Sequence, residues 1–392
     1  MLGTSFSPWP SFDEEEANTV RDVLLSNRVN YWTGDECRQF EMEFAAWADA
    51  EYAVAVANGT VALDVALKAL GVSAGDEVIV TSRTFLASVS SIVTAGAVPV
   101  FVDVDRNSQN ISAELIAPAI TDKTRAIICV HLAGWPCEMD SIVALAESHG
   151  LYVIEDCAQA HGARYRGRSV GSIGHIGAWS FCQDKIITTG GEGGMVTTND
   201  RDLWSKMWSY KDHGKSWEAV YESEHPPGFR WLHESFGTNW RMTEMQAAIG
   251  RIQLRRMAEW HHSRTNNASA ILEVCEQYPS LFRVPRPPEH VEHAWYKCYV
   301  FVRPEGLKAT WSRDRMIEEI TARGVPCYSG SCSEVYLEKA FDGTGFRPKA
   351  RLLVAKELGE TALMFLVHPT LTADEIALTC SVIQEVAGMV AA

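Results

Sequence analysis

The chain has little positive charge for its size. Its 392 residues include 35 Lys and Arg against 50 Asp and Glu, which gives a formal net charge of −15. Proteins that bind nucleic acid need a basic surface to neutralise phosphates, so this composition argues against a nucleic-acid partner. An anionic small molecule can still bind through a helix N-terminus and a few local Lys or Arg side chains.

Long hydrophobic runs are also missing. The most apolar stretch, residues 88–102, is interrupted by Gly96 and Pro99 and is too short to cross a bilayer. Residues 1–10 lack the basic start and apolar core of a signal peptide, and three glutamates follow at 14–16. We therefore expect no membrane partner and a cytoplasmic location.

Recognised metal and dinucleotide motifs are absent from the sequence. The ten cysteines include no Cys-x-x-Cys pair, and Cys327 and Cys332 do not have a zinc spacing. His131, His161 and His213 offer no metal spacing either, so we expect buried free thiols and no metal site. No strand-like segment is followed by Gly-x-Gly-x-x-Gly, which disfavours a nicotinamide-linked oxidoreductase.

Strand-like and helix-like segments alternate along the first half of the chain. Strands are predicted at 53–57, 77–81, 98–103, 126–131 and 151–155, with helices at 61–70, 86–94 and 139–148 between them. Such alternation is typical of an α/β fold with a mostly parallel central sheet and helices on both faces.

The pattern changes after two further strands at 178–181 and 194–198. Residues 204–236 are rich in Trp, Tyr, His and Lys and are predicted to form an ordered functional loop. A long helix is expected from residue 243 towards 275, and the remainder predicts a smaller α+β unit. We therefore predict a large domain at 1–255 and a small C-terminal domain at 256–392.

A lysine and a carboxylate stand where a cofactor site is expected. Asp156 follows an apolar strand, and the carboxyl end of a parallel strand is where α/β sheets place ligands. Lys185 lies between a strand and the glycine-rich stretch 190–194, whose glycines permit close backbone approach. Taken alone, Asp156 is typical of a helix cap or salt bridge, and most lysines are surface charges. Together they are the lysine and carboxylate that pyridoxal phosphate needs from a protein.

Other residues extend this pattern. Gly59 and Thr60 stand between a strand and a helix, where backbone N–H groups and a hydroxyl are suited to hold a phosphate. Ser180 adds a second hydroxyl, and the Phe85 ring is placed to lie flat on a pyridine. Each has a simpler reading, since a Gly-Thr turn often only starts a helix and Phe85 alone would be a core residue. Asn239 precedes the long helix and on its own would only cap it.

In this order the segments resemble the DegT/DnrJ/EryC1/StrS family of sugar aminotransferases, a branch of the fold-type I aminotransferases. The resemblance covers nearly the whole chain. It is carried by Trp32-Thr33-Gly34 with Phe40-Glu41, residues 57–63, residues 155–163, Ser180-Phe181 through Lys185, residues 191–194, residues 237–242 with 246–248, and residues 366–369.

The resemblance implies a role for each candidate. Lys185 would form the imine link to pyridoxal 5'-phosphate and then shuttle the proton, and Asp156 would pair with the pyridine nitrogen. Gln159 would approach the ring hydroxyl and Phe85 would stack on the ring. The phosphate would be held by Gly59, Thr60 and Ser180, and by Asn239 of a neighbouring subunit, which implies a homodimer with shared active sites.

The implied activity moves an amino group from glutamate to a keto sugar, typically nucleotide-linked, in surface polysaccharide or related sugar biosynthesis. Two alternatives share the fold: a pyridoxal-phosphate-dependent sugar dehydratase, which carries histidine at the position of Lys185, and a non-catalytic regulator. Within residues 208–231, Lys211, His213 and Lys215 are hypothesised to meet an anionic acceptor. The ring position aminated and the nucleotide carrier are not encoded in any motif we find.

Overall fold

The computed structural model describes residues 6–390 and consists of helices packed around two main sheets. The α-helices are α1 Glu14–Leu25, α2 Glu36–Trp47, α3 Gly59–Ala69, α4 Ala87–Thr94, α5 Ala113–Ile116, α6 Met139–His149, α7 Arg201–Lys211, α8 Glu244–Glu276, α9 Arg313–Ala322, α10 Leu353–Thr361 and α11 Ala373–Val390. The strands are β1 Tyr52–Val56, β2 Glu77–Thr81, β3 Val98–Val102, β4 Thr124–Val130, β5 Tyr152–Asp156, β6 Arg164–Tyr165, β7 Arg168–Ser169, β8 Ile176–Ser180, β9 Gly194–Thr198, β10 Phe282–Arg283, β11 Val291–Glu292, β12 Cys298–Val302, β13 Cys327–Tyr328 and β14 Ala362–Phe365.

The central sheet has seven strands in the order β1-β9-β8-β5-β4-β2-β3. Strands β8, β5, β4, β2 and β3 pair in parallel, and β9 runs antiparallel between β1 and β8. Their residues are buried in near-continuous runs, as expected for a sheet covered on both faces. This confirms the predicted fold class, and it brings the carboxyl ends of β4, β5 and β8 to one edge.

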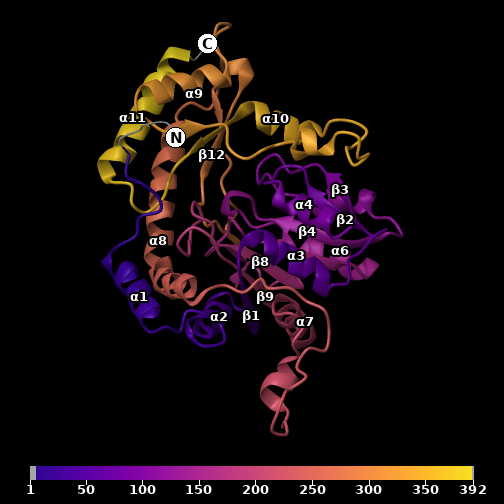
Figure 1. Cartoon of the computed structure of the whole chain (residues 1–392). Helices are drawn as coiled ribbons and strands as arrows, with labels where there is room; N and C mark the ends of the chain where they lie inside the picture. The colour runs from indigo at the N-terminus through magenta and orange to yellow at the C-terminus, as the bar shows by residue number, and fades with distance from the viewer. Residues whose placement is uncertain (1–5, 391–392) are drawn as a thin grey trace.

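Helix α8 links this sheet to the second, four-stranded sheet β10-β12-β14-β13. It packs against α1 and α2 near its start and against β12 and α11 further along (Figure 1). The predicted long helix is therefore confirmed. The division at residue 255 stays a prediction, because α8 runs without interruption across that position.

One local expectation needs correction. The segment 204–236 was predicted as a loop, but residues up to Lys211 belong to α7, whose buried face is formed by Leu203, Met207, Trp208 and Lys211. The first helix, α1, is capped by Asp13 in a capping box with Glu16.

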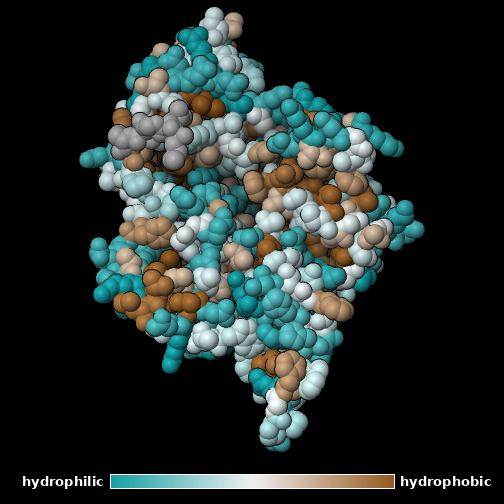
Figure 2. All heavy atoms as spheres, in the orientation of Figure 1, coloured by the Kyte–Doolittle hydropathy of each residue, from teal (hydrophilic) through white to brown (hydrophobic). Residues whose placement is uncertain are grey.

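The chain after α7 projects away from the body, at the bottom of Figure 1. Large hydrophobic side chains there are exposed: Phe229, Trp231 and Phe236 have 75%, 80% and 99% of their surface accessible. Hydrophobic atoms also gather over α1 and α2 at the lower left of Figure 2, where Leu24, Leu25 and Met42 are exposed. Within residues 6–390, no helix combines the length and the apolar character that crossing a membrane requires.

Candidate active site

A cavity of about 580 Å³ opens at the carboxyl ends of β4, β5 and β8. It gathers every predicted cofactor-binding residue except Asn239. Its lining consists of Asn58, Gly59, Thr60, Val61, Leu63, Thr84, Phe85, Ala87, Ser88, Val130, Asp156, Ala158, Gln159, Ser180, Cys182, Asp184, Lys185 and Glu192. The side chains come from segments as far apart in the sequence as Asn58 and Glu192, so the parallel sheet is what assembles them.

One wall is a cradle at the first turn of α3. Asn58 caps the helix by accepting a hydrogen bond from Val61 N at 3.0 Å, which leaves the backbone at Gly59 and Thr60 facing the cavity. A Cβ on Gly59 would lie 2.4 Å from Ser180 Cβ, so only glycine allows this approach. The helix start, the Ser180 hydroxyl and the exposed Thr60 hydroxyl together form a site of the kind that binds phosphate.

Asp156, the last residue of β5, is 6% exposed and lines the same cavity. Its Oδ2 accepts a hydrogen bond from Ser88 Oγ at 2.8 Å, and its Oδ1 accepts one from Ala158 N at 3.1 Å. Burial raises the pKa of Asp156, although the Ser88 and Ala158 donors and the charge of Lys185 act in the opposite direction. A buried carboxylate with so few donors is suited to pair with a cation in the cavity.

Gln159 and Phe85 frame the space between these two walls. Gln159 Oε1 accepts a hydrogen bond from Ala133 N at 2.8 Å. This bond fixes the orientation of the amide and turns its N–H groups away from Ala133. The Phe85 ring is 71% exposed, which excludes the core-residue alternative for this aromatic side chain. An exposed ring at the mouth of a cavity is available to stack on a planar ligand.

Lys185 is held at both its backbone and its amine. Trp9 Nε1 donates a hydrogen bond to Lys185 O at 2.8 Å. Lys185 Nζ lies 3.4 Å from the Tyr296 hydroxyl oxygen and 3.7 Å from Asp184 Oδ1. The ε-amine therefore has defined partners beside the cavity, unlike a solvated surface lysine.

Asn239 lies outside the cavity and is exposed, next to the buried Asp212 with which its backbone pairs. The hypothesis of an anion site at Lys211 is wrong, because this side chain is fully buried and pairs with Glu41 at 3.3 Å. Lys215 is also engaged, since its Nζ lies 3.0 Å from Asp212 Oδ1.

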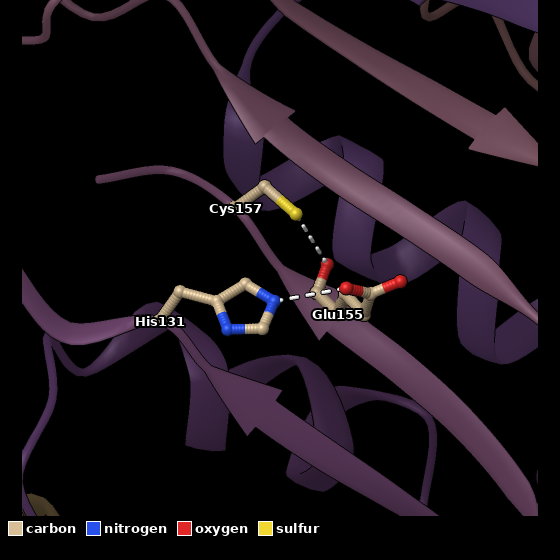
Figure 3. A group of neighbouring side chains, drawn as sticks. All are labelled: His131, Glu155 and Cys157. Atoms are coloured by element: carbon tan, nitrogen blue, oxygen red, sulfur yellow. Dashed lines mark hydrogen bonds and ion pairs between the residues drawn. The ribbon is translucent and has the colours of Figure 1, made fainter. Parts of the chain in front are cut away.

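Behind the cavity, His131, Glu155 and Cys157 form a buried group at the ends of β4 and β5 (Figure 3). His131 Nδ1 accepts from a backbone N–H, which leaves Nε2 to donate to Glu155 Oε2 at 3.0 Å. Glu155 also accepts from the backbone N–H groups of Gly171, Ile173 and Gly174. Burial raises the pKa of Cys157 well above its usual value. These atoms already have partners, and we propose no metal here.

Three side chains at the site were missed from the sequence: Ser88, Trp9 and Tyr296. Ser88 carries no signal beyond its position three residues after Phe85. Trp9 and Tyr296 lie 176 and 111 residues from Lys185, so no local pattern connects them to it. The aromatic and basic run Trp295-Tyr296-Lys297 before a strand was the one available hint.

Comparisons with known proteins agree with this site. The family model described as DegT/DnrJ/EryC1/StrS aminotransferase family matches residues 10–384. GDP-perosamine synthase of Escherichia coli O157:H7 is 36% identical over 376 residues, which cover 96% of each chain. A crystal structure of an aminotransferase from Psychrobacter cryohalolentis has 67% identity and a TM-score of 0.97, covering 98% of this chain and 99% of that one.

A more distant structure shows a relative with the cofactor. The putative sugar aminotransferase Spr1654 from Streptococcus pneumoniae in its PLP form has 25% identity and a TM-score of 0.85, covering 98% of each chain. Because the family model spans nearly the whole chain, this protein belongs to the DegT/DnrJ/EryC1/StrS aminotransferase family.

Proposed function

We propose that this chain is a pyridoxal-phosphate-dependent sugar aminotransferase that moves an amino group from glutamate to a keto sugar, typically nucleotide-linked. The observation that carries the proposal is the convergence of Lys185, Asp156 and the Gly59–Ser180 cradle around one cavity. The relative named GDP-perosamine synthase supports a nucleotide-linked acceptor. Surface polysaccharide or related amino-sugar biosynthesis is the corresponding setting.

The residues present fit the cofactor. When bound, pyridoxal phosphate supplies the electron sink for chemistry at the carbon that carries the amino group. We assign Asp156 to the ring nitrogen, because its carboxylate is buried and keeps only two donors of its own. Gln159 is assigned to the ring hydroxyl and Phe85 to the ring face. The cradle of Gly59, Thr60 and Ser180 is assigned to the phosphate.

Lys185 is assigned two tasks. Its ε-amine is the attachment point for the cofactor's aldehyde carbon, and after release it carries the proton between the two reacting carbons. The amine lies at the edge of the cavity with its side chain 16% exposed, which restricts water at that nitrogen. This lysine also distinguishes the proposal from a sugar dehydratase, in which the family resemblance implies histidine at this position.

Asn239 is assigned to the active site of a neighbouring subunit, in a homodimer with shared sites. It is exposed outside its own cavity, and the chain around it is fixed because Asp212 pairs with Arg241 at 2.6 Å. The segment that projects from the body after α7 exposes Phe229, Trp231 and Phe236, a surface that a second subunit would cover.

We also propose a cytoplasmic location, which fits ten cysteines that are all free.

Absorbance tests the proposal. The purified protein loaded with pyridoxal phosphate should show a band near the violet edge of the spectrum, and excess glutamate should convert that band. The protein that has reacted with glutamate is then mixed with a panel of nucleotide-linked 3-keto and 4-keto sugars, and the true acceptor restores the band. A non-catalytic regulator would leave the band unchanged by glutamate, and a dehydratase would yield a deoxy keto sugar that carries no amino group.

A further inference from the structure

The ε-amine of Lys185 belongs to a closed triangle of three side chains. Lys185 Nζ lies 3.4 Å from the Tyr296 hydroxyl oxygen and 3.7 Å from Asp184 Oδ1. The Tyr296 hydroxyl donates a short hydrogen bond to Asp184 Oδ2. The amine therefore meets one phenol oxygen and one carboxylate, and these two are bonded to each other.

The ionisation of the triangle follows from its surroundings. Burial alone would raise the pKa of Asp184, but the charge of Lys185 and the Tyr296 hydroxyl bring it below its ordinary value. Burial, together with the negative charge of Asp184, raises the pKa of Tyr296 well above its ordinary value. Asp184 is thus an anion and Tyr296 a neutral donor at neutral pH, so both oxygens can accept hydrogen bonds from an ammonium group.

A second lysine lies on the same aromatic ring. Lys297 Nζ is 4.9 Å and Lys185 Nζ 5.0 Å from the centroid of the Tyr296 ring. Burial, with the nearby charges of Arg264 and Lys185, lowers the pKa of Lys297 to about 8. Among the described residues, Asp184 is the acid within ion-pair distance of Lys185. Its negative charge therefore balances the positive charges of Lys185 and Lys297.

The main chain of Lys185 is fixed separately. Trp9 donates to the Lys185 carbonyl at 2.8 Å, and the guanidinium of Arg264 lies 5.1 Å from the centre of the Trp9 ring. With the backbone held by the N-terminal segment, movement of the amine is confined to the lysine side chain. The triangle then defines where that side chain rests.

We propose that Tyr296 and Asp184 form an amine-holding site, which binds the ε-amine of Lys185 whenever that nitrogen is not bonded to the cofactor. This inference rests on the proposed function. Two N–H groups of the ammonium are taken by the Tyr296 oxygen and the Asp184 carboxylate, and the third faces the cavity, where the substrate carbon must be protonated. The proton taken up by Lys185 stays on its nitrogen until it is returned to the substrate carbon.

In this role Tyr296 and Asp184 are positioning residues that act through Lys185. Misplacing a proton carrier by about 1 Å costs on the order of 100-fold in rate. We therefore expect Tyr296→Phe to lower the maximal rate of the glutamate half-reaction by ~10- to 100-fold. The glutamate concentration giving half-maximal rate should stay within about twofold, because neither residue is assigned to binding the donor.

Tests use the protein loaded with pyridoxal phosphate, in variants Tyr296→Phe and Asp184→Asn. Tyr299→Phe is the matched control, since Tyr299 is also a buried tyrosine, and its hydroxyl bonds to Ser331 and not to Lys185. The Asp184 side chain is 58% exposed, so the isosteric asparagine should fold. Thermal melting and circular dichroism check folding for all three variants.

The second readout is the pH–rate profile of the reverse half-reaction, in which the pyridoxamine form reacts with 2-oxoglutarate and Lys185 starts free of the cofactor. Loss of the Asp184 charge or the Tyr296 oxygen makes a positive charge at the Lys185 nitrogen less favourable. The limb of this profile that reports the charge of the free amine should therefore move to lower pH in both variants and stay in place in Tyr299→Phe.

Two results would overturn the amine-holding site. One is a wild-type rate and a wild-type pH–rate profile in both variants. The other is a rate loss that follows the loss of melting temperature with no movement of the pH–rate profile, since that result describes a pair with a structural role alone. If the wild-type band itself fails to respond to glutamate, the proposed function fails instead, and the two failures are told apart by the wild-type sample alone.

Discussion

Two neighbouring carboxylates on β5 face opposite sides of the sheet and have opposite surroundings. Glu155 accepts hydrogen bonds from His131 and from three backbone N–H groups, whereas within residues 6–390 the Asp156 side chain accepts only from Ser88 and Ala158. Burial opposes the charge of both carboxylates, but His131 and the backbone N–H groups of Gly174 and Gly171 bring the pKa of Glu155 below its usual value, while that of Asp156 is raised. A carboxylate whose acceptors are filled organises the fold, and one left short of donors is available to a ligand.

The largest effect is expected at Asp156. Asp156→Asn keeps an acceptor oxygen for Ala158 N, and its amide N–H can donate to Ser88 Oγ, but the substitution removes the charge assigned to the ring nitrogen. We expect the glutamate half-reaction to slow by ~100-fold or more, the scale of losing one preorganised electrostatic partner. The melting temperature should not fall at pH 7, because burial opposes the aspartate charge. Stopped-flow absorbance measures the rate, and calorimetry measures the melting temperature. An unstable variant with a normal rate would contradict the assignment of Asp156 to the ligand and not to the fold.

Glu155→Gln should show the opposite result, a loss of stability with little loss of rate. An amide cannot accept all four hydrogen bonds and places N–H groups against backbone donors, so folding should lose ~3 kcal/mol, as for breaking a buried ion pair. Denaturant unfolding measures this loss. The half-reaction rate per cofactor-loaded protein should change less than ~10-fold, because Glu155 does not line the cavity. A large rate loss in a protein of normal stability would place Glu155 in the chemistry.

The pH dependence of stability sharpens the contrast. The lowered pKa of Glu155 means that its charge stabilises the fold above about 4.5, its usual value, and that this stability is lost as the pH falls through the folded-state pKa. The raised pKa of Asp156 has the reverse sign, so its charge costs stability as the pH rises above 3.8. Melting temperatures from pH 7 down to pH 3 should therefore show wild type and Glu155→Gln converging. Parallel curves would contradict the assignment for Glu155.

The smallest effect is expected at Ser88. Ser88→Ala removes one of the two hydrogen bonds to Asp156, which should raise the pKa of that carboxyl further and cost about 1 kcal/mol of folding free energy. We expect less than a ~10-fold loss in half-reaction rate at pH 7, with the limb of the pH–rate profile that reports Asp156 displaced to higher pH. If the pH–rate profile of Ser88→Ala coincides with that of the wild type, the result counts against Ser88 acting through Asp156.

Sequence reasoning located the fold and the cavity because both depend on local order. Alternating strands and helices predict a parallel sheet, and a polar residue that ends a buried strand is then placed at its ligand edge, as Asp156 is. Helix α7 was missed because its aromatic and lysine side chains were read as a functional surface, although Leu203, Met207 and Lys211 lie four residues apart on one buried face.

The partners of the site residues that come from distant parts of the chain could not be predicted from the sequence. Neither Trp9 nor Tyr296 carries a motif, and their contacts with Lys185 exist only once α8 and the second sheet are in place. The role of Glu155 was equally hidden, since adjacent strand residues alternate faces and no local signal shows which face has a ring of donors.

Reduction of the cofactor-loaded protein with borohydride, followed by peptide mass spectrometry, tests the central claim most directly. The account predicts that the reduced cofactor is bonded to the peptide containing Lys185. Cofactor found on the peptide of Lys297, the other lysine at this corner of the site, or on no lysine at all, would contradict it.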